Sequence, residues 1–216
     1  MRTPRIATAL LAAVAATVTL AQEIAPGGRR ASRPERPDWE FALTAYPTKV
    51  RNGDDTTSAI AAADRGPLHL EARYGYETKD SRSAFVGWTF SGGETVTWEL
   101  TPLVGGAWGP LRAFVPGFEA SLAWGKIDLY VEAEFVRDRL ESSDNYNYAW
   151  SELGFKALEW LRIGAVGQRT RAYGGEREFQ RGPFVQVAKG PVTLGAYWFN
   201  PGSAGQVTVL SVGVAF

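Results

Sequence analysis

Few residues in this chain combine the type and spacing that acid–base or nucleophilic catalysis requires. The sequence has a single histidine, His69, and no cysteine. A serine nucleophile needs a general base within hydrogen-bond reach, and the sequence spacing places no serine beside His69. Glu132 and Glu134 would project from one face of a strand, about 7 Å apart, and could act as an acid–base pair. Such a pair more often forms part of a polar wall, so we predict no catalytic residue.

Acidic residues in the segment 137–145 are the candidates for a metal site. Asp138, Glu141 and Asp144 offer oxygen ligands for Ca²⁺, but their spacing fits no recognised calcium-loop motif. Without cysteine the chain has no thiolate zinc site. The 23 basic and 23 acidic residues cancel, which gives no argument for a nucleic-acid partner. The sequence therefore predicts neither a metal nor a cofactor.

The first residues have the pattern of a secretory signal peptide. Arg2 and Arg5 precede the apolar run 6–20, and the small residue Ala21 then leads into a polar segment. An uncleaved membrane anchor is the alternative, but the run is only about 15 residues, and a spanning helix needs roughly 20. We predict a signal peptide at 1–21, cleaved after Ala21, and a flexible periplasmic lead-in at 22–37, which is rich in Pro, Gly, Ser and Arg.

Residues 38–216 form one predicted domain, in which short alternating segments are separated by turn residues. Short turns, most of them with a glycine, alternate with longer polar segments, which we place at 50–57, 78–83, 105–116, 137–145, 173–178 and 200–206. This alternation is typical of outer-membrane barrels, where short turns face the periplasm and longer loops face outward. The expected strands are 39–49, 57–64, 67–77, 83–91, 94–104, 116–124, 126–136, 146–157, 160–172, 179–188, 191–199 and 206–216.

The predicted fold is therefore all-β: a closed antiparallel transmembrane β-barrel of about twelve strands. An even number returns both ends of the barrel to the periplasmic side. Ten strands are the alternative, because residues 58–63 are rich in alanine and could form a helical turn instead of a strand.

The volume of the side chains, rather than their periodicity, decides which row of each strand faces lipid. In 67–77, for example, Leu68, Leu70, Ala72, Tyr74 and Tyr76 share one row. A soluble barrel of the lipocalin kind would turn such rows inward, but a dozen strands would then overfill the interior, so we predict that the apolar rows face lipid. Aromatic residues near strand ends are expected at the membrane interfaces. They are Trp39, Tyr76, Phe90, Trp108, Trp124, Trp150, Trp160 and Trp198.

The closing segment, Val209-Leu210-Ser211-Val212-Gly213-Val214-Ala215-Phe216, resembles the C-terminal strand of Gram-negative outer-membrane barrels. In that class, alternating apolar residues end in a terminal Phe that the barrel-insertion machinery recognises. The resemblance implies that Phe216 is an insertion signal. It also implies that the protein resides in the outer membrane, in contact with its lipids and lipopolysaccharide. The sequence assigns no oligomeric state.

With the apolar rows facing lipid, the opposite rows carry ionisable side chains into the lumen. Two interpretations stay open: a structural network of paired charges, or a hydrated pore in which an excess of carboxylates favours cations or small polar solutes. The predicted lumen-lining residues are Glu40, His69, Glu71, Arg73, Glu99, Glu119, Asp128, Glu132, Glu134, Glu152 and Arg162.

Arg169 and Arg171 do not fit this scheme, because the alternation of 160–172 turns them outward. Either they lie at the rim and meet lipopolysaccharide phosphates, or a bulge near Gly167 turns them into the lumen as a constriction opposite Glu132, Glu134 or Glu152.

We expect a small passive channel or a structural barrel, and no enzyme. The alternative class is a lipid-modifying enzyme or an adhesion module that works through the extracellular loops. Enzymatic barrels act near the outer rim, whereas His69 is expected near the periplasmic end of its strand.

Overall fold

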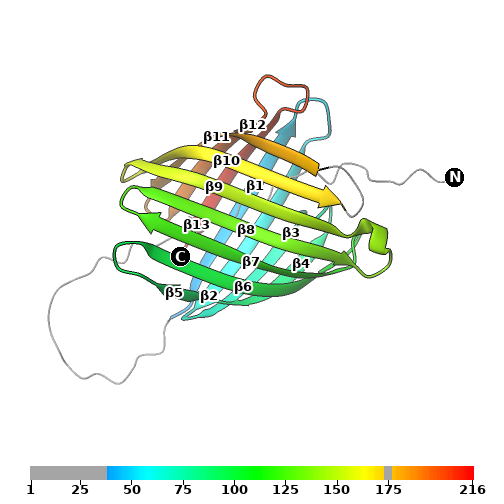
Figure 1. Ribbon diagram of the computed structural model, residues 1–216, viewed down its shortest axis with the longest axis horizontal. Helices are drawn as coiled ribbons and strands as arrows, with labels where there is room; N and C mark the ends of the chain where they lie inside the picture. Colours follow the sequence, from blue (N-terminus) through cyan, green and yellow to red (C-terminus); the bar gives the residue numbers. More distant parts are fainter. Residues whose placement is uncertain (1–37, 173–176) are drawn as a thin grey trace.

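The computed structural model describes residues 38–172 and 177–216, which form one closed antiparallel β-barrel (Figure 1). The predicted signal peptide 1–21 and lead-in 22–37 lie outside the described residues, as do 173–176 of one predicted loop. The strands are β1 (Glu40–Val50), β2 (Thr56–Arg65), β3 (Leu68–Tyr74), β4 (Arg82–Trp88), β5 (Phe90–Gly92), β6 (Thr97–Trp108), β7 (Ala113–Trp124), β8 (Ile127–Asp138), β9 (Tyr146–Leu158), β10 (Leu161–Ala172), β11 (Arg177–Lys189), β12 (Val192–Phe199) and β13 (Val207–Ala215).

The barrel has twelve strand positions, as predicted. Apart from β4 and β5, each strand pairs with its sequence neighbours, and β1 pairs with β13. β4 and the short β5 pair with successive parts of β6, so together they occupy one position and close the ring. The alanine-rich segment that could have been helical is β2, which pairs with β1 and β3 along its length.

Connections of two lengths separate the two ends of the barrel. At one end the turns are tight; Gly66 and Gly125 take φ of +57° there, a conformation that favours glycine. At the other end the loops are longer, and one of them carries the 3-10 turn η1 (Ser142–Asp144). By the rule for outer-membrane barrels the long-loop end is extracellular. No helix in the described part of the chain is long and apolar enough to cross a membrane.

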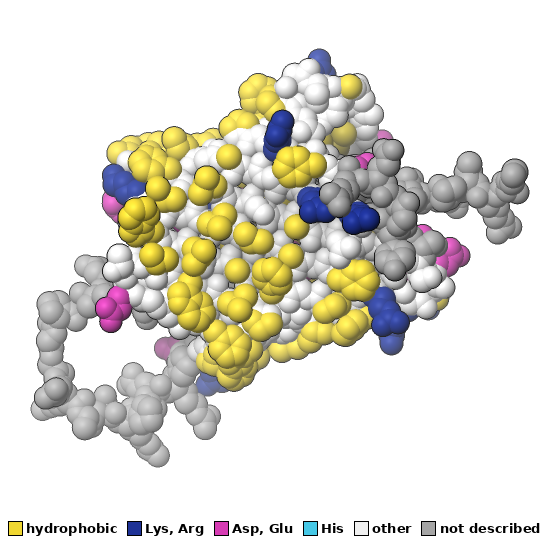
Figure 2. Space-filling model, in the orientation of Figure 1, with side chains coloured by type: hydrophobic (Ala, Val, Ile, Leu, Met, Phe, Trp, Pro, Cys, Tyr) yellow, Lys and Arg dark blue, Asp and Glu magenta, His cyan; other side chains and the backbone are white. Residues whose placement is uncertain are grey.

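Burial alternates along the strands and places the apolar rows outside. Leu70, Leu129 and Val212 are all exposed, and Val212 reaches 50%. Figure 2 shows a broad apolar field on the outer face, with charged side chains toward its margins. β-branched and aromatic residues suit a pleated surface, and here their outward rows form the belt that lipid would cover.

The predicted loop 105–116 is wrong over most of its length. β6 continues to Trp108 and β7 begins at Ala113. The pair Gly105-Gly106 looks like a turn signal in the sequence, but it lies within β6. A Cβ atom on Gly105 would lie 2.3 Å from the ring of Phe85, so this glycine makes room for an inward phenyl ring.

Two of the predicted interface aromatics are also wrong, because Tyr76 and Trp150 lie in the lumen. Both are buried, and Trp150 has 0% exposure. Trp150 belongs to the inward row of β9. Strand β3 ends at Tyr74, and Gly75 with φ of +64° breaks the alternation, so that both Tyr76 and Glu77 point inward.

Replacing a lipid-facing leucine tests the orientation. Leu153 lies near the middle of β9 and is 54% exposed. In Leu153→Arg we expect the free energy of unfolding from a bilayer to fall by about 2–4 kcal/mol, because an arginine near mid-membrane depth is poorly solvated. Urea titration of the refolded protein measures this loss.

Leu140→Arg is the matched control, since Leu140 is 71% exposed in a long-end loop. This substitution should change stability by less than about 0.5 kcal/mol. Equal losses in the two variants would contradict the outward orientation of the leucine row.

Candidate functional site in the charged lumen

The predicted lumen-lining residues occupy the inward rows. Six of them are buried: His69, Glu71, Arg73, Glu132, Glu134 and Glu152. Glu99, Glu119, Asp128 and Arg162 are partly exposed. Glu40 is exposed at the short-turn end, in the same row as the buried Thr44 and Tyr46.

Arg73 joins two walls of the barrel that are not neighbours in the sheet. Its Nη1 donates to Glu134 at 2.6 Å and lies 3.3 Å from Glu132, both on β8, and its Nε donates to Glu71 on β3. The Tyr76 hydroxyl donates to Glu132 at 2.5 Å. The guanidinium group also lies 4.2 Å from the ring centres of Tyr76 and Phe85. One buried cation thus neutralises part of a carboxylate cluster across the lumen.

His69 extends this cluster toward the short-turn end. Its Nδ1 lies 2.7 Å from Asp64, and its Nε2 lies 3.3 Å from Glu71. Because carboxylates face both ring nitrogens, neither nitrogen is bonded to a hydroxyl group in the described part of the chain. The pattern is that of a histidine in an ionic network rather than of a general base beside a nucleophile.

The same region contains a set of residues with metal-ligand chemistry. Donor atoms of His69, Glu71 and Glu119 all lie within 4.8 Å of one another. Glu71 is already paired with Arg73, and His69 with Asp64. These ion pairs account for the cluster without a cation.

A second network surrounds Arg162 on β10. Its Nε lies 2.9 Å from Asp128, and its Nη1 donates to Glu152 at 2.5 Å and to Gln186 at 2.7 Å. A Cβ atom on Gly154 would lie 2.3 Å from Arg162 Nε. Glycine at that position therefore makes room for the guanidinium group.

Aromatic side chains fill the lumen on the side opposite Arg73. Trp150 packs edge-on against Tyr197 and Phe199, with ring centres 5.5 and 5.3 Å apart. Tyr46 is also fully buried and belongs to the same cluster. All four of these aromatic side chains have 0% exposure, so the rings pack tightly in this part of the lumen.

A cavity of about 800 Å³ lies at the long-loop end, lined by the loops that follow β1, β3 and β12. Tyr76 and Glu77 belong to its wall and also to that of a much smaller cavity of about 20 Å³, which Glu134 lines as well. We call the larger cavity the vestibule. Its inner end is thus marked by Tyr76 and Glu77.

Glu77 is a site residue that the sequence reasoning missed. It is buried and accepts hydrogen bonds from Ser81 at 3.1 Å and Ser83 at 2.5 Å. No lysine or arginine of the described residues pairs with it. The sequence did hold a signal for this residue: position 77 lies an even number of residues after Glu71 and Arg73, in the row expected to face the lumen. Strand β3 nevertheless ends at Tyr74, before Glu77.

The predicted constriction by Arg169 and Arg171 is wrong. The register shift in the β9–β10 ladder falls at Leu161 and Arg162 and not near Gly167. Gln168 is therefore the buried inward residue, and both arginines are exposed on the outer face. The structure thus places both arginines on the outward row, near the long-loop end of β10.

Comparison with known proteins finds similarity in structure only. No family model matches the chain, and no curated protein matches its sequence. KdgM porin is similar with a TM-score of 0.57 at 10% identity, over 81% of this chain and 98% of KdgM. A KdgM porin structure in complex with disordered oligogalacturonate gives the same TM-score at 7% identity. Omp33 of Acinetobacter baumannii is 15% identical over 84% of this chain and 99% of Omp33, with a TM-score of 0.43.

The fold is that of a porin-like outer-membrane β-barrel. The exposed apolar belt and the closed strand ring agree with this assignment, since only helices and closed barrels satisfy their backbone groups in lipid. The apolar belt gives this barrel the outer surface of a membrane-spanning protein.

Removing the central cation tests the Arg73 network. Arg73→Met leaves Glu71, Glu132 and Glu134 without their shared partner. We expect a loss of about 3–5 kcal/mol in the free energy of unfolding, because buried charges become uncompensated. Denaturant titration in the same bilayer measures the loss.

Arg82→Met provides the control, because Arg82 is exposed on the outward row of β4. That variant should stay within about 0.5 kcal/mol of the parent protein. If Arg73→Met were no less stable than Arg82→Met, the network would not be a source of stability.

Proposed function

We propose that this protein is a narrow passive channel that favours small cations. The observation that carries the proposal is Glu77, a buried carboxylate without a cationic partner among the described residues, at the inner end of an 800 Å³ vestibule. A carboxylate at a pore entrance lowers the energy of a cation relative to an anion. Glu134 lines the small cavity next to Glu77 and gives the pathway a second carboxylate.

The charge balance of the lumen supports the same preference. Its carboxylates outnumber the guanidinium groups of Arg73 and Arg162, even with His69 counted as a cation. The inward acidic residues described above are Glu40, Glu71, Glu77, Glu99, Glu119, Asp128, Glu132, Glu134 and Glu152. A lumen with this excess attracts cations and repels anions.

Unpaired polar atoms in the lumen suggest a partner other than protein. Arg73 Nη2, Tyr130 Oη and Glu132 Oε2 are buried and have no hydrogen-bond partner among the described protein atoms. Buried polar groups nearly always have partners. Water along a hydrated path would supply them, since it can accept from Arg73 Nη2 and donate to Glu132 Oε2.

The solute named for KdgM does not transfer to this chain. Oligogalacturonate is a polyanion, and the acidic excess of this lumen would repel it. The similarity to KdgM concerns the fold alone, at 7–10% identity.

A closed structural barrel is the second candidate function, and the filled lumen favours it. Trp150, Tyr197 and Glu132 each have 0% exposure. Conduction would need small side-chain movements near Tyr76 and Arg73, so we expect low conductance rather than the wide opening of a large porin.

Planar-bilayer recording of the refolded protein separates the two functions. We expect discrete small openings and a reversal potential in a KCl gradient that indicates preference for K⁺ over Cl⁻. Glu77→Gln should reduce the K⁺/Cl⁻ permeability ratio several-fold, because it removes the entrance charge, while its amide can accept from one of Ser81 and Ser83 and donate to the other.

Glu159→Gln serves as the matched control, since Glu159 is exposed in the short turn between β9 and β10. This variant should conduct like the parent protein. Electrical silence of correctly folded protein would reject the channel and support the structural barrel. An unchanged permeability ratio in Glu77→Gln would reject Glu77 as the selective group.

A further inference from the structure

The charged residues on the outward rows of the described strands are all basic. None of these rows contains an aspartate or a glutamate, whereas the inward rows contain many. Arg65 and Lys189 lie at the short-turn end. The other six gather at the long-loop end: Lys49, Arg82, Arg137, Arg169, Arg171 and Arg181.

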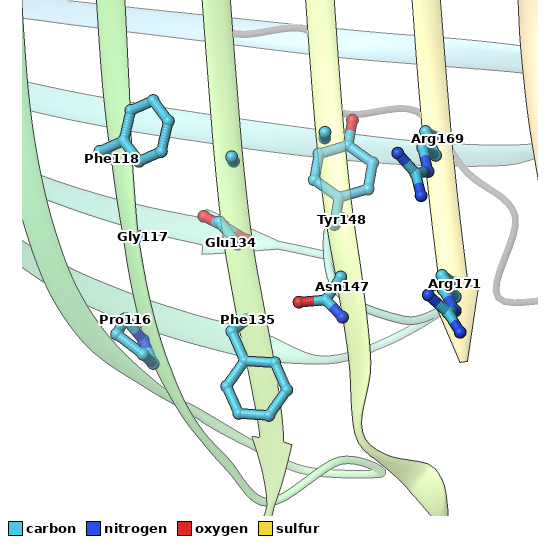
Figure 3. A pocket seen from close by; sticks show the side chains of 11 residues that line it. Pro116, Gly117, Phe118, Glu134, Phe135, Asn147, Tyr148, Arg169 and Arg171 are labelled. Carbon is cyan, nitrogen blue, oxygen red and sulfur yellow. The ribbon is translucent and has the colours of Figure 1, made fainter. Parts of the chain in front are cut away.

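A groove of about 550 Å³ lies on this outer face, across β7, β8, β9 and β10. Strand pairing explains its shape, because Phe118 pairs with Ala133, Ala133 with Ala149, and Ala149 with Arg169. Two alanines therefore form a low floor between a phenyl ring and a guanidinium group. Figure 3 shows Phe118 on one side of the groove and Arg169 on the other.

The next row toward the long-loop end repeats this arrangement with a polar floor. Phe135 pairs with Asn147, and Asn147 pairs with Arg171. In Figure 3, Arg169 and Arg171 lie one above the other along β10, with Asn147 between Arg171 and Phe135. Among the described residues, no carboxylate forms an ion pair with either arginine. The groove thus combines two free cations and an amide with an apolar wall.

The row toward the middle of the membrane is also built from smaller side chains. Ala120 pairs with Val131, Val131 with Ser151, and Ser151 with Gly167. Small side chains thus continue from the floor of the groove toward the centre of the lipid belt. A long, narrow and apolar acyl chain would fit along this row of small side chains.

A second copy of the chain is a poor occupant for this groove. Two arginines on a lipid-facing surface need an anionic partner, and the outward rows of the described strands offer no carboxylate. Contact between two such faces would place cation against cation. An acylated phosphate meets both demands, because its phosphate binds guanidinium groups and its chains are apolar.

We propose that this groove binds a phosphorylated lipid of the outer leaflet, the lipid A part of lipopolysaccharide. Arg169 and Arg171 hold a phosphate at headgroup depth, Asn147 adds a hydrogen bond, and an acyl chain lies along Ala133 and Ala149. This site is independent of the proposed channel, since it uses the opposite face of the wall.

Native mass spectrometry of the detergent-solubilised full chain, titrated with bisphosphorylated lipid A, tests the site. We expect the parent protein to retain one lipid A molecule. Arg169→Gln/Arg171→Gln should bind about tenfold more weakly or worse, because two charge-assisted contacts to phosphate are lost. Dephosphorylated lipid A should bind the parent protein as weakly as bisphosphorylated lipid A binds this variant.

The matched control is Arg65→Gln/Lys189→Gln, which removes the same charge from the short-turn end of the same face. Its affinity should stay within twofold of the parent protein. An equal loss in both double variants would indicate general charge attraction and overturn the site. Phosphatidylglycerol binding as tightly as lipid A would also overturn the proposed specificity.

Ala149→Phe provides a test that leaves every charge in place. The added ring should fill the floor of the groove and weaken lipid A binding. Heat-modifiable migration on a gel shows that each variant is folded before titration. Full binding by folded Ala149→Phe, or by the folded double arginine variant, would overturn the proposal.

Discussion

The closed ring of backbone hydrogen bonds is the constraint on which the rest of the structure depends. In lipid an unpaired peptide group has no water to bind, so every strand needs two neighbours. β13 returns to β1, and the interrupted β4–β5 position returns to β6. Once the ring is closed, each strand has one face toward lipid and one toward a narrow interior. Most acidic side chains of the strands must then share that interior.

The interior meets this demand by ion pairing across the lumen. Arg73 and Arg162 each collect carboxylates from more than one strand, and aromatic rings fill the space beside them. The pairing is incomplete, because acidic groups are in excess. Glu77 illustrates this excess, because it accepts hydrogen bonds from two serine hydroxyls and pairs with no lysine or arginine of the described residues.

Sequence periodicity predicted the strands and the two rows because a period of two residues is a property of the chain itself. It failed where neighbouring strands decide the outcome. Gly105 looks like part of a loop until the ring of Phe85 is placed beside it. Tyr76 changes sides because Gly75 leaves the strand conformation, and its contact with Glu132 comes from a distant strand. The ion-pair partners of each lumenal charge likewise depend on which strands face each other across the barrel. The alternation within one strand does not contain that information.

The alternation of side chains along a single strand also separates the lumenal surface from the lipid-facing surface. On β8, Glu134 faces the lumen and Phe135 the lipid groove; on β10, Gln168 and Arg169 divide in the same way. A slip of one residue in β10 would bury Arg169 in the lumen and expose Gln168 to lipid. The only shift in the β9–β10 ladder lies at its short-turn end, away from both sites. Strand register is therefore the property that both proposed activities share, although no side chain need serve both.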